Sequence, residues 1–127
     1  MANADNLPRV TLQHVSLEVR SEDAPAELRF WSLLGFEEVE PAGTLAEVAA
    51  WAQRGGTQIH LLYAEDPVIP PSGHAAVVAE DFDATVAALR DAGFTPEERT
   101  RHWGAARAFV HTPAGHVVEV MAEPPPG

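Results

Sequence analysis

The feature that most constrains the fold is an internal repeat, in which residue patterns of the first half of the chain recur in the second half at a nearly constant offset. His14 recurs as His74, and a Gly-Phe pair that begins at Gly35 recurs at almost the same offset. His60, in the apolar segment TQIHLLY, has Glu119 as its counterpart. Two copies are too few for a solenoid. They predict two similar modules that pair as halves of one core, related by a pseudo-two-fold axis.

Each copy of the repeat predicts one strand, one helix and three further strands. In TLQHVSLEV apolar and polar side chains alternate, which is typical of a half-buried strand. A glycine stands at the C-terminal end of each predicted helix, at Gly35 and Gly93, and is suited to end it. The residues of the first helix that we expect to face the core are Leu28, Leu34 and either Phe30 or Trp31. Helices and strands in this arrangement predict the α+β class.

The predicted elements follow the repeat closely. The strands of module one are expected at 11–19, 36–40, 45–53 and 57–63, with a helix at 26–34. The strands of module two are expected at 74–80, 94–98, 106–112 and 115–121, with a helix at 81–93.

The segment DPVIPPSG, which holds three prolines and a glycine, predicts a linker between the modules. We therefore expect one domain over residues 1–127. Module one is expected at about 10–65, the linker at 66–73, module two at about 74–122 and a flexible tail at 123–127, with a loose tail at 1–9.

Composition excludes several classes of function. The formal charge of −11 disfavours binding to nucleic acid or to an anionic membrane surface. The absence of cysteine excludes disulfides, thiolate ligands and a cysteine nucleophile. No apolar run approaches the roughly 20 residues of a membrane span. The sequence MANADNLPRV does not have the pattern of a secretory signal, so the expected location is the cytoplasm.

Four polar residues stand at repeat-equivalent positions in apolar strands. Alternation places His14, His60, His74 and Glu119 each on the strand face opposite the helices. A two-fold axis allows all four to meet in one cavity. Imidazole and carboxylate groups suit Zn²⁺, Ni²⁺, Co²⁺, Fe²⁺ or Mn²⁺. One strand histidine is usually a core or surface residue, but four such residues in a repeat, one of them a costly buried carboxylate, favour a metal site.

These segments resemble the vicinal oxygen chelate superfamily, which includes glyoxalase I, extradiol dioxygenases and bleomycin-resistance proteins. The resemblance covers about residues 10–122. It rests on LQHVSLEV, FWSLLGFEEV, QIHLL, HAAVVAEDFDATVAALRDAGF and VVEVMAE. It implies two βαβββ modules that form a curved mixed sheet, or pseudo-barrel, around a metal-binding cavity. It also implies metal ligation by His14, His60, His74 and Glu119, a small-molecule substrate and a homodimer.

The resemblance favours a metal-dependent lyase or isomerase, in which the metal acts as a Lewis acid on an oxygen-chelating substrate and Glu119 moves a proton. The counterpart of Glu119 is His60 rather than a second glutamate, which argues against glyoxalase I activity itself. One alternative is a non-haem Fe(II) dioxygenase of the extradiol type, with His14, His74 and Glu119 as its triad. Another is a protein that sequesters a cationic antibiotic such as bleomycin, which the charge of −11 would suit.

The candidates for contact with the substrate lie on the same strand faces or in nearby loops. Arg107 is expected to share a face with Phe109 and His111, and Met121 with Glu119. Of the arginines, only Arg101 and Arg107 are expected at the mouth of the cavity. The full set of substrate-binding candidates is Trp51, Trp103, Arg107, Phe109, His111 and Met121.

Overall fold

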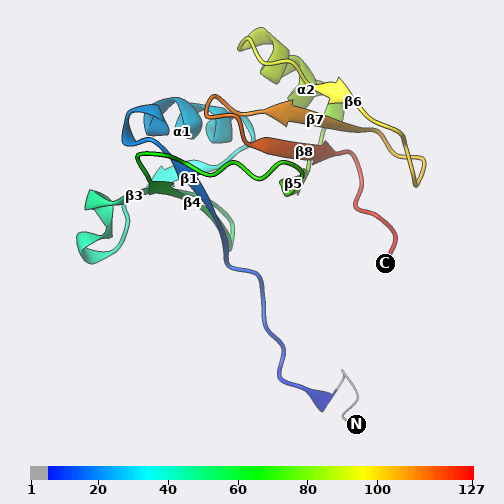
Figure 1. Ribbon diagram of the computed structural model, residues 1–127. Helices are drawn as coiled ribbons and strands as arrows, with labels where there is room; N and C mark the ends of the chain where they lie inside the picture. Colours follow the sequence, from blue (N-terminus) through cyan, green and yellow to red (C-terminus); the bar gives the residue numbers. More distant parts are fainter. Residues whose placement is uncertain (1–5) are drawn as a thin grey trace.

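The computed structural model describes residues 6–127, and Figure 1 shows two similar modules that follow one another along the chain. Module one contains β1 (His14–Val19), α1 (Ala24–Leu33), β2 (Glu37–Val39), β3 (Ala49–Arg54) and β4 (Thr57–Tyr63). Module two contains β5 (Ala75–Val78), α2 (Phe82–Asp91), β6 (Glu97–Glu98), β7 (Arg107–His111) and β8 (Val117–Met121). The prediction of the α+β class with two βαβββ modules is confirmed.

Each module folds into its own four-stranded mixed sheet, and the two sheets have the same topology. Their strand orders are β1-β4-β3-β2 and β5-β8-β7-β6. The first strand pairs in parallel with the last, and the other pairs are antiparallel. Trp51 lies opposite His60 in module one, and Phe109 lies opposite Glu119 in module two. The repeat in the sequence is therefore also a repeat in strand register.

The modules pack together through α1 and not by joining their sheets. One cluster of buried side chains contains residues of both modules, including Phe30 of α1 and Val118 of β8. The ring of Phe30 meets that of Phe94 edge to face at 5.1 Å between centroids. Figure 1 shows α1 beside the turn between β7 and β8. Both β1 and β5 are left as edge strands of their sheets.

A glycine follows the C-cap residue of each α-helix and adopts a left-handed backbone conformation that other residues rarely adopt. Gly35 has φ of 87° and Gly93 has φ of 95°. A Cβ atom at position 35 would lie 2.9 Å from Nη1 of Arg54, so the flexible end of that side chain would have to shift. None of the helices in residues 6–127 has the length and apolar character to cross a membrane.

Several predicted element boundaries were wrong. The predicted strand at 45–53 begins instead as a short 3-10 helix, η3 (Gly43–Glu47), and β3 starts only at Ala49. The strand predicted at 94–98 is reduced to Glu97–Glu98, since Pro96 cannot donate a backbone hydrogen bond to a sheet. Residues 11–13 precede β1. The predicted loose tail at 1–9 lies in part, at residues 1–5, outside the described residues.

The buried stripe of α1 also differs from the prediction. Glu27 is completely buried, whereas Leu28 is only half-buried. One carboxylate oxygen of Glu27 accepts a hydrogen bond of 2.6 Å from the backbone N–H of Ala114, in the β7–β8 turn. The Nε2 atom of His116 donates to the backbone oxygen of Glu18 at 2.7 Å. The other side-chain oxygen of Glu27 has no hydrogen-bond partner among the described residues. Alternation and helical spacing predict neither the burial of Glu27 nor its contact with the other module.

Candidate functional site

The predicted ligands lie on the face of each sheet that points away from the shared core, which we call the open face. In β4 the side chains of Ile59 and Leu61 enter the core, so His60 between them points to the open face. In β8 the side chains of Val118 and Val120 enter the core, and Glu119 points outward in the same way. Both His60 and Glu119 are nevertheless buried, because neighbouring side chains cover them.

The first of two ligand pairs consists of His14 and His60, which we call the module-one pair. Their rings stack at 3.9 Å between centroids, with an angle of 15° between the planes. The indole of Trp51 stacks on the His60 ring as well, with 4.1 Å between centroids and an angle of 4° between the planes, so that His60 lies between His14 and Trp51. The three rings line a cavity of about 540 Å³, together with the apolar side chains of Leu45, Val48 and Leu62.

Glutamine side chains hold both rings of the module-one pair. The Nδ1 atom of His14 donates to Gln13 Oε1 at 2.7 Å, and the Nε2 atom of His60 donates to Gln58 Oε1 at 2.7 Å. Burial lowers the pKa of His60, and the nearby His14 lowers it further. A lowered pKa favours the neutral imidazole, which is the form that binds a metal ion. Each ring keeps one nitrogen that these bonds do not use.

The second pair, His74 and Glu119, forms the module-two pair. The Nε2 atom of His74 lies 3.0 Å from Glu119 Oε1, and the Nε atom of Arg107 donates to Glu119 Oε2 at 2.7 Å. Arg107 also donates through Nη1 to the backbone oxygen of Thr100 at 2.9 Å. Burial would raise the pKa of Glu119, but the hydrogen bonds and charges of Arg107 and His74 outweigh burial and lower it. Glu119 is therefore held as a carboxylate.

The facing atoms of the module-two pair need either a second ring proton on His74 or a metal ion between them. The backbone oxygen of Ser72 can only accept, so Nδ1 of His74, at 2.9 Å, carries the proton that it donates. In the neutral ring Nε2 then presents a lone pair to Glu119 Oε1. Two acceptors 3.0 Å apart repel each other unless a second ring proton or a metal ion lies between them. Two ligands at right angles, with bonds of about 2.1 Å, are also roughly 3 Å apart. The donor set and this separation fit a divalent metal ion.

The structure does not bring the four predicted ligands together within one chain. Among residues 6–127 no group of three His, Asp or Glu side chains is placed to hold a metal ion. The predicted single cavity is therefore divided into two pairs. The physical reason is the packing of the modules, because contacts from α1 to the β7–β8 turn fix their relative position while the two described sheets share no strand pair.

The predicted substrate-binding residues are spread over several environments. Phe109 lies beside His74, at 5.0 Å between ring centroids, and Met121 is buried on the same face of β8 as Glu119. Trp103 lies near Arg107 and donates through Nε1 to the Glu123 backbone oxygen at 3.1 Å. His111 is exposed at the end of β7.

Sequence reasoning missed two residues beside the pairs. Arg99 places its guanidinium carbon 5.0 Å from the centre of the Phe109 ring. No periodic pattern indicated this position, because the chain around β6 is irregular. Gln58, which holds His60, lies two residues before it on the same strand face, so strand alternation was a signal that could have identified it.

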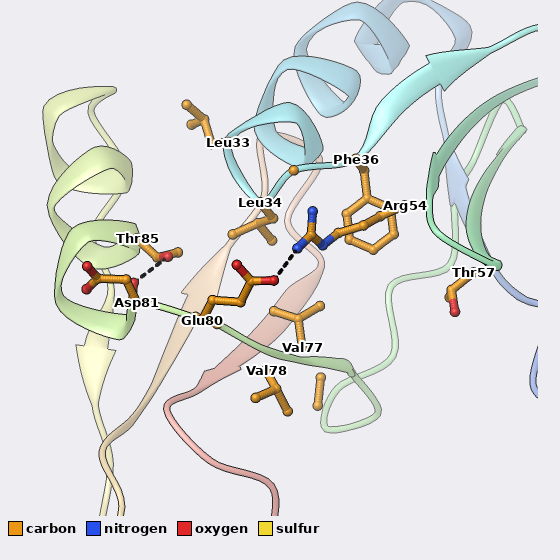
Figure 2. Close-up of a pocket in the computed structure, with 13 residues that line it drawn as sticks. Leu33, Leu34, Phe36, Arg54, Thr57, Val77, Val78, Glu80, Asp81 and Thr85 are labelled. Carbon is orange, nitrogen blue, oxygen red and sulfur yellow. Dashed lines mark hydrogen bonds and ion pairs between the residues drawn. The ribbon is translucent and has the colours of Figure 1, made fainter.

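A further pocket lies between the modules and apart from both pairs (Figure 2). Its volume is about 530 Å³. Figure 2 shows the ion pair that crosses it, in which Arg54 Nη2 donates to Glu80 Oε1 at 3.1 Å. Leu33, Leu34, Phe36 and Val77 contribute apolar walls. The residues that line this pocket include no member of either pair.

Comparison with known proteins places this geometry in a family context. The family model described as Glyoxalase/Bleomycin resistance protein/Dioxygenase superfamily matches residues 11–120. No curated protein matches the sequence.

Solved structures share the fold at low sequence identity. A putative glyoxalase family protein from Bacillus anthracis superposes with a TM-score of 0.81 at 20% identity, over 95% of this chain and 98% of that one. A lactoylglutathione lyase from Agrobacterium tumefaciens gives a TM-score of 0.69 at 21% identity, over 91% and 95%. The oxidase ChaP-H2 gives 0.71 at 22% identity, over 91% and 94%. At these identities the likeness shows the fold alone.

Proposed function

The chain belongs to the glyoxalase, bleomycin resistance protein and dioxygenase superfamily, and on that premise we propose that it is a divalent-metal-dependent enzyme acting on a small, oxygen-chelating molecule. The reaction class that we favour is that of a glyoxalase-like lyase or isomerase. The observation that supports the proposal is the separation of 3.0 Å between His74 Nε2 and Glu119 Oε1, two atoms that need either a second ring proton or a metal ion between them and whose spacing fits two ligands of one metal.

The proposed metal ligands are His14, His60, His74 and Glu119. Three imidazoles and one carboxylate suit Zn²⁺, Ni²⁺, Co²⁺, Fe²⁺ or Mn²⁺. A metal bound there would supply Lewis-acid polarisation of a substrate oxygen.

We propose that the functional unit is a homodimer, in which the module-one pair of one chain meets the module-two pair of the other. Within residues 6–127 each chain holds two separate pairs of ligands and no complete set. The open faces beside the pairs also expose apolar side chains that a partner copy would cover, among them Leu62 and Val78. A two-fold dimer would contain two identical composite sites.

The chain's own residues suit proton transfer and binding next to such a site. Arg107 occupies Oε2 of Glu119, so Oε1, the oxygen that faces His74, is the one that would either contact the metal or accept a proton. The lowered pKa keeps Glu119 ionised at neutral pH, so it is available as a base. The flat surface of Trp51 and His60 offers a wall for an apolar part of the substrate. Phe109 provides a second aromatic surface beside His74.

One observation favours the second candidate, a non-haem Fe(II) dioxygenase. The ring of His60 is stacked between His14 and Trp51, and its Nε2 atom is already bonded to Gln58. If His60 stays in this position, the remaining ligands form a triad of two histidines and one carboxylate, which is the pattern of such oxygenases. Turnover of catechols with Fe²⁺ in air, and none with Ni²⁺ or Zn²⁺, would select this reaction.

The proposal is tested by elemental analysis of purified protein dialysed against each metal in turn. We expect about one metal ion per wild-type chain, and a loss of most of it in His74→Ala and in Glu119→Ala. His111→Ala, an exposed histidine outside both pairs, is the control and should keep its metal. A wild-type protein that takes up no stoichiometric metal would refute the enzyme proposal and favour sequestration of a ligand.

Mixing two defective chains tests the shared site. One chain carries His14→Ala with His60→Ala, and the other carries His74→Ala with Glu119→Ala. Each alone should bind no metal. Random mixing gives one intact composite site in each heterodimer, so about a quarter of the wild-type metal content should return. No recovery after verified subunit exchange would show that the two pairs do not meet between chains.

A further inference from the structure

The region between β6 and β7 carries positive charge in a strongly acidic chain. The formal charge of the protein is −11, and it contains eight arginines. Three of them, Arg99, Arg101 and Arg107, follow one another closely in the sequence, and Arg107 bonds directly to Glu119 of the module-two pair. Glu97 and Glu98 partly offset this charge, at 3.7 Å from Arg99 and 3.8 Å from Arg101. An exposed guanidinium group still attracts anions locally.

Arg99 and Arg107 both lie over the ring of Phe109. Their guanidinium carbons are 5.0 Å and 5.1 Å from the centre of the ring, which is within the range of cation–π contact. The same ring lies 5.0 Å from that of His74. Phe109 therefore forms a common floor that holds the two guanidinium groups next to the module-two pair.

The two arginines differ in what remains free for a ligand. The side chain of Arg107 is only 12% exposed and is committed to Glu119 and to the backbone oxygen of Thr100. The side chain of Arg99 is 48% exposed. Its nearest carboxylate oxygen, on Glu97, is 3.7 Å away, which is too long for a hydrogen bond. Arg99 thus has its donors available while the aromatic ring beneath restricts its orientation.

From this geometry we infer that Arg99, supported by Phe109, binds an anionic group of the substrate, a carboxylate or a phosphate, while an adjacent oxygen of the same molecule reaches the module-two pair. A guanidinium group forms two parallel hydrogen bonds with either anion. Arg99 and His74 both contact the Phe109 ring, and this limits the distance that one ligand must bridge between them. The Arg99 guanidinium carbon and the centre of the His74 ring each lie 5.0 Å from the centre of the Phe109 ring, so their separation cannot exceed the sum of these two distances.

The inference names a substrate class for the proposed function and rests on it for the role of the module-two pair. A small 2-oxo or 2-hydroxy acid, or a phosphate ester of similar size, has a charged group and a neighbouring oxygen within this span. A large neutral substrate does not use Arg99. The module-one pair lies in a cavity with apolar walls and has no arginine among its lining residues, so the anionic end belongs to module two.

The experiment measures binding of three probes to the metal-loaded wild-type protein by isothermal titration. Pyruvate tests the carboxylate, methyl phosphate tests the phosphate, and pyruvamide is the neutral counterpart of pyruvate. We expect one of the two anions to bind at least tenfold more tightly than pyruvamide, because hydrogen bonds from a guanidinium group to a charged acceptor are stronger than those to a neutral one. The tighter anion identifies the class.

Variants at two exposed arginines, Arg99 and Arg101, show whether Arg99 is responsible for the preference for an anion. Arg99→Ala should weaken binding of the preferred anion about tenfold or more, and Arg99→Lys should weaken it less. Arg101→Ala is the matched control, because its side chain is 57% exposed, lies near a glutamate at 3.8 Å and has no aromatic ring beneath it among the cation–π contacts of the described residues. Equal losses in Arg99→Ala and Arg101→Ala, or no loss in Arg99→Ala, would overturn the inference.

Metal content, measured on the same samples, separates failure of this inference from failure of the proposed function. We expect Arg99→Ala to keep the wild-type metal content. If the wild type holds metal but neither anion binds better than pyruvamide, the substrate class is wrong and the metal site stands. If the wild type holds no metal, the proposed function fails, and the anion titration of the metal-free protein still decides whether Arg99 binds anions.

Discussion

The two modules share a topology, but their candidate ligands are stabilised in different ways. In module one the imidazoles of His14 and His60 are held by aromatic stacking, and Ala49 lies on the neighbouring strand β3. In module two Arg107 stands at the strand position that corresponds to Ala49, and it bonds to the Glu119 carboxylate. The aromatic partner is retained in both modules, as Trp51 and Phe109. An imidazole can be buried neutral, whereas a buried carboxylate needs a counter-charge, so replacing one ligand type by the other required a second change nearby.

Removing the counter-charge of module two should give the largest effect. Arg107→Ala leaves the Glu119 carboxylate buried with only His74 beside it, and we expect the free energy of unfolding of metal-free protein to fall by about 3–5 kcal/mol. Urea denaturation at pH 7 measures this loss. In a Glu119→Gln background the same change should cost much less. An equal cost in both backgrounds would show that Arg107 stabilises the fold by packing and not by pairing.

Removing the aromatic surface of module one should have a smaller effect. Trp51→Leu keeps an apolar side chain but loses the stack on His60, and we expect a loss of about 0.5–1.5 kcal/mol beyond the change in buried area. Phe109→Leu is the matched change in module two. We expect the loss of stability to be larger in Trp51→Leu, because the imidazoles of module one depend on aromatic stacking, and denaturation curves of the two variants measure the difference. A larger loss in Phe109→Leu would contradict this expectation.

The pH dependence of stability should also distinguish the modules, with the smallest effect at His60. The pKa of His60 is lowered in the folded protein, so below pH 6.5 the unfolded chain binds a proton there more readily than the folded one. Stability should therefore fall as pH decreases from 6.5 through the folded pKa. The lowered pKa of Glu119 acts in the same direction below pH 4.5.

Denaturation of metal-free protein across this pH range checks both contributions. His60→Gln should remove the loss of stability that begins as the pH falls below about 6.5, and Glu119→Gln should remove the loss that begins below about pH 4.5. A wild-type curve that is unchanged by His60→Gln between about pH 5 and 7 would contradict the assignment to module one.

Much of the fold could be predicted because the repeat and the alternation are local properties of the chain. The offset between His60 and Glu119 indicated two modules of one topology, and alternation indicated the face to which each strand residue points. The start of β3 could not be resolved, since Leu45 and Val48 are spaced as suitably for a helical turn as for a strand end. The pattern gave no sign that Glu27 would be buried, because its partner is a backbone N–H distant in sequence.

The candidate site was harder to predict than the fold. Alternation orients the side chains of His14 and His74 within their own sheets but says nothing about how two sheets are placed relative to each other. That placement depends on contacts of α1 with the β7–β8 turn, which are tertiary. Arg99 was missed for a similar reason, because its role depends on a ring in the neighbouring strand.

Among residues 6–127, β1 and β5 each pair on one side only, and these open edges affect how the protein is expected to behave when diluted. An edge strand offers a row of free backbone donors and acceptors, and such rows promote aggregation unless they are covered. Here Val78 lies on an edge strand, and Leu62 lies on the strand next to the other edge, both with their side chains exposed. A chain separated from its proposed partner would therefore be prone to precipitate, so solubility is expected to depend on keeping the dimer assembled.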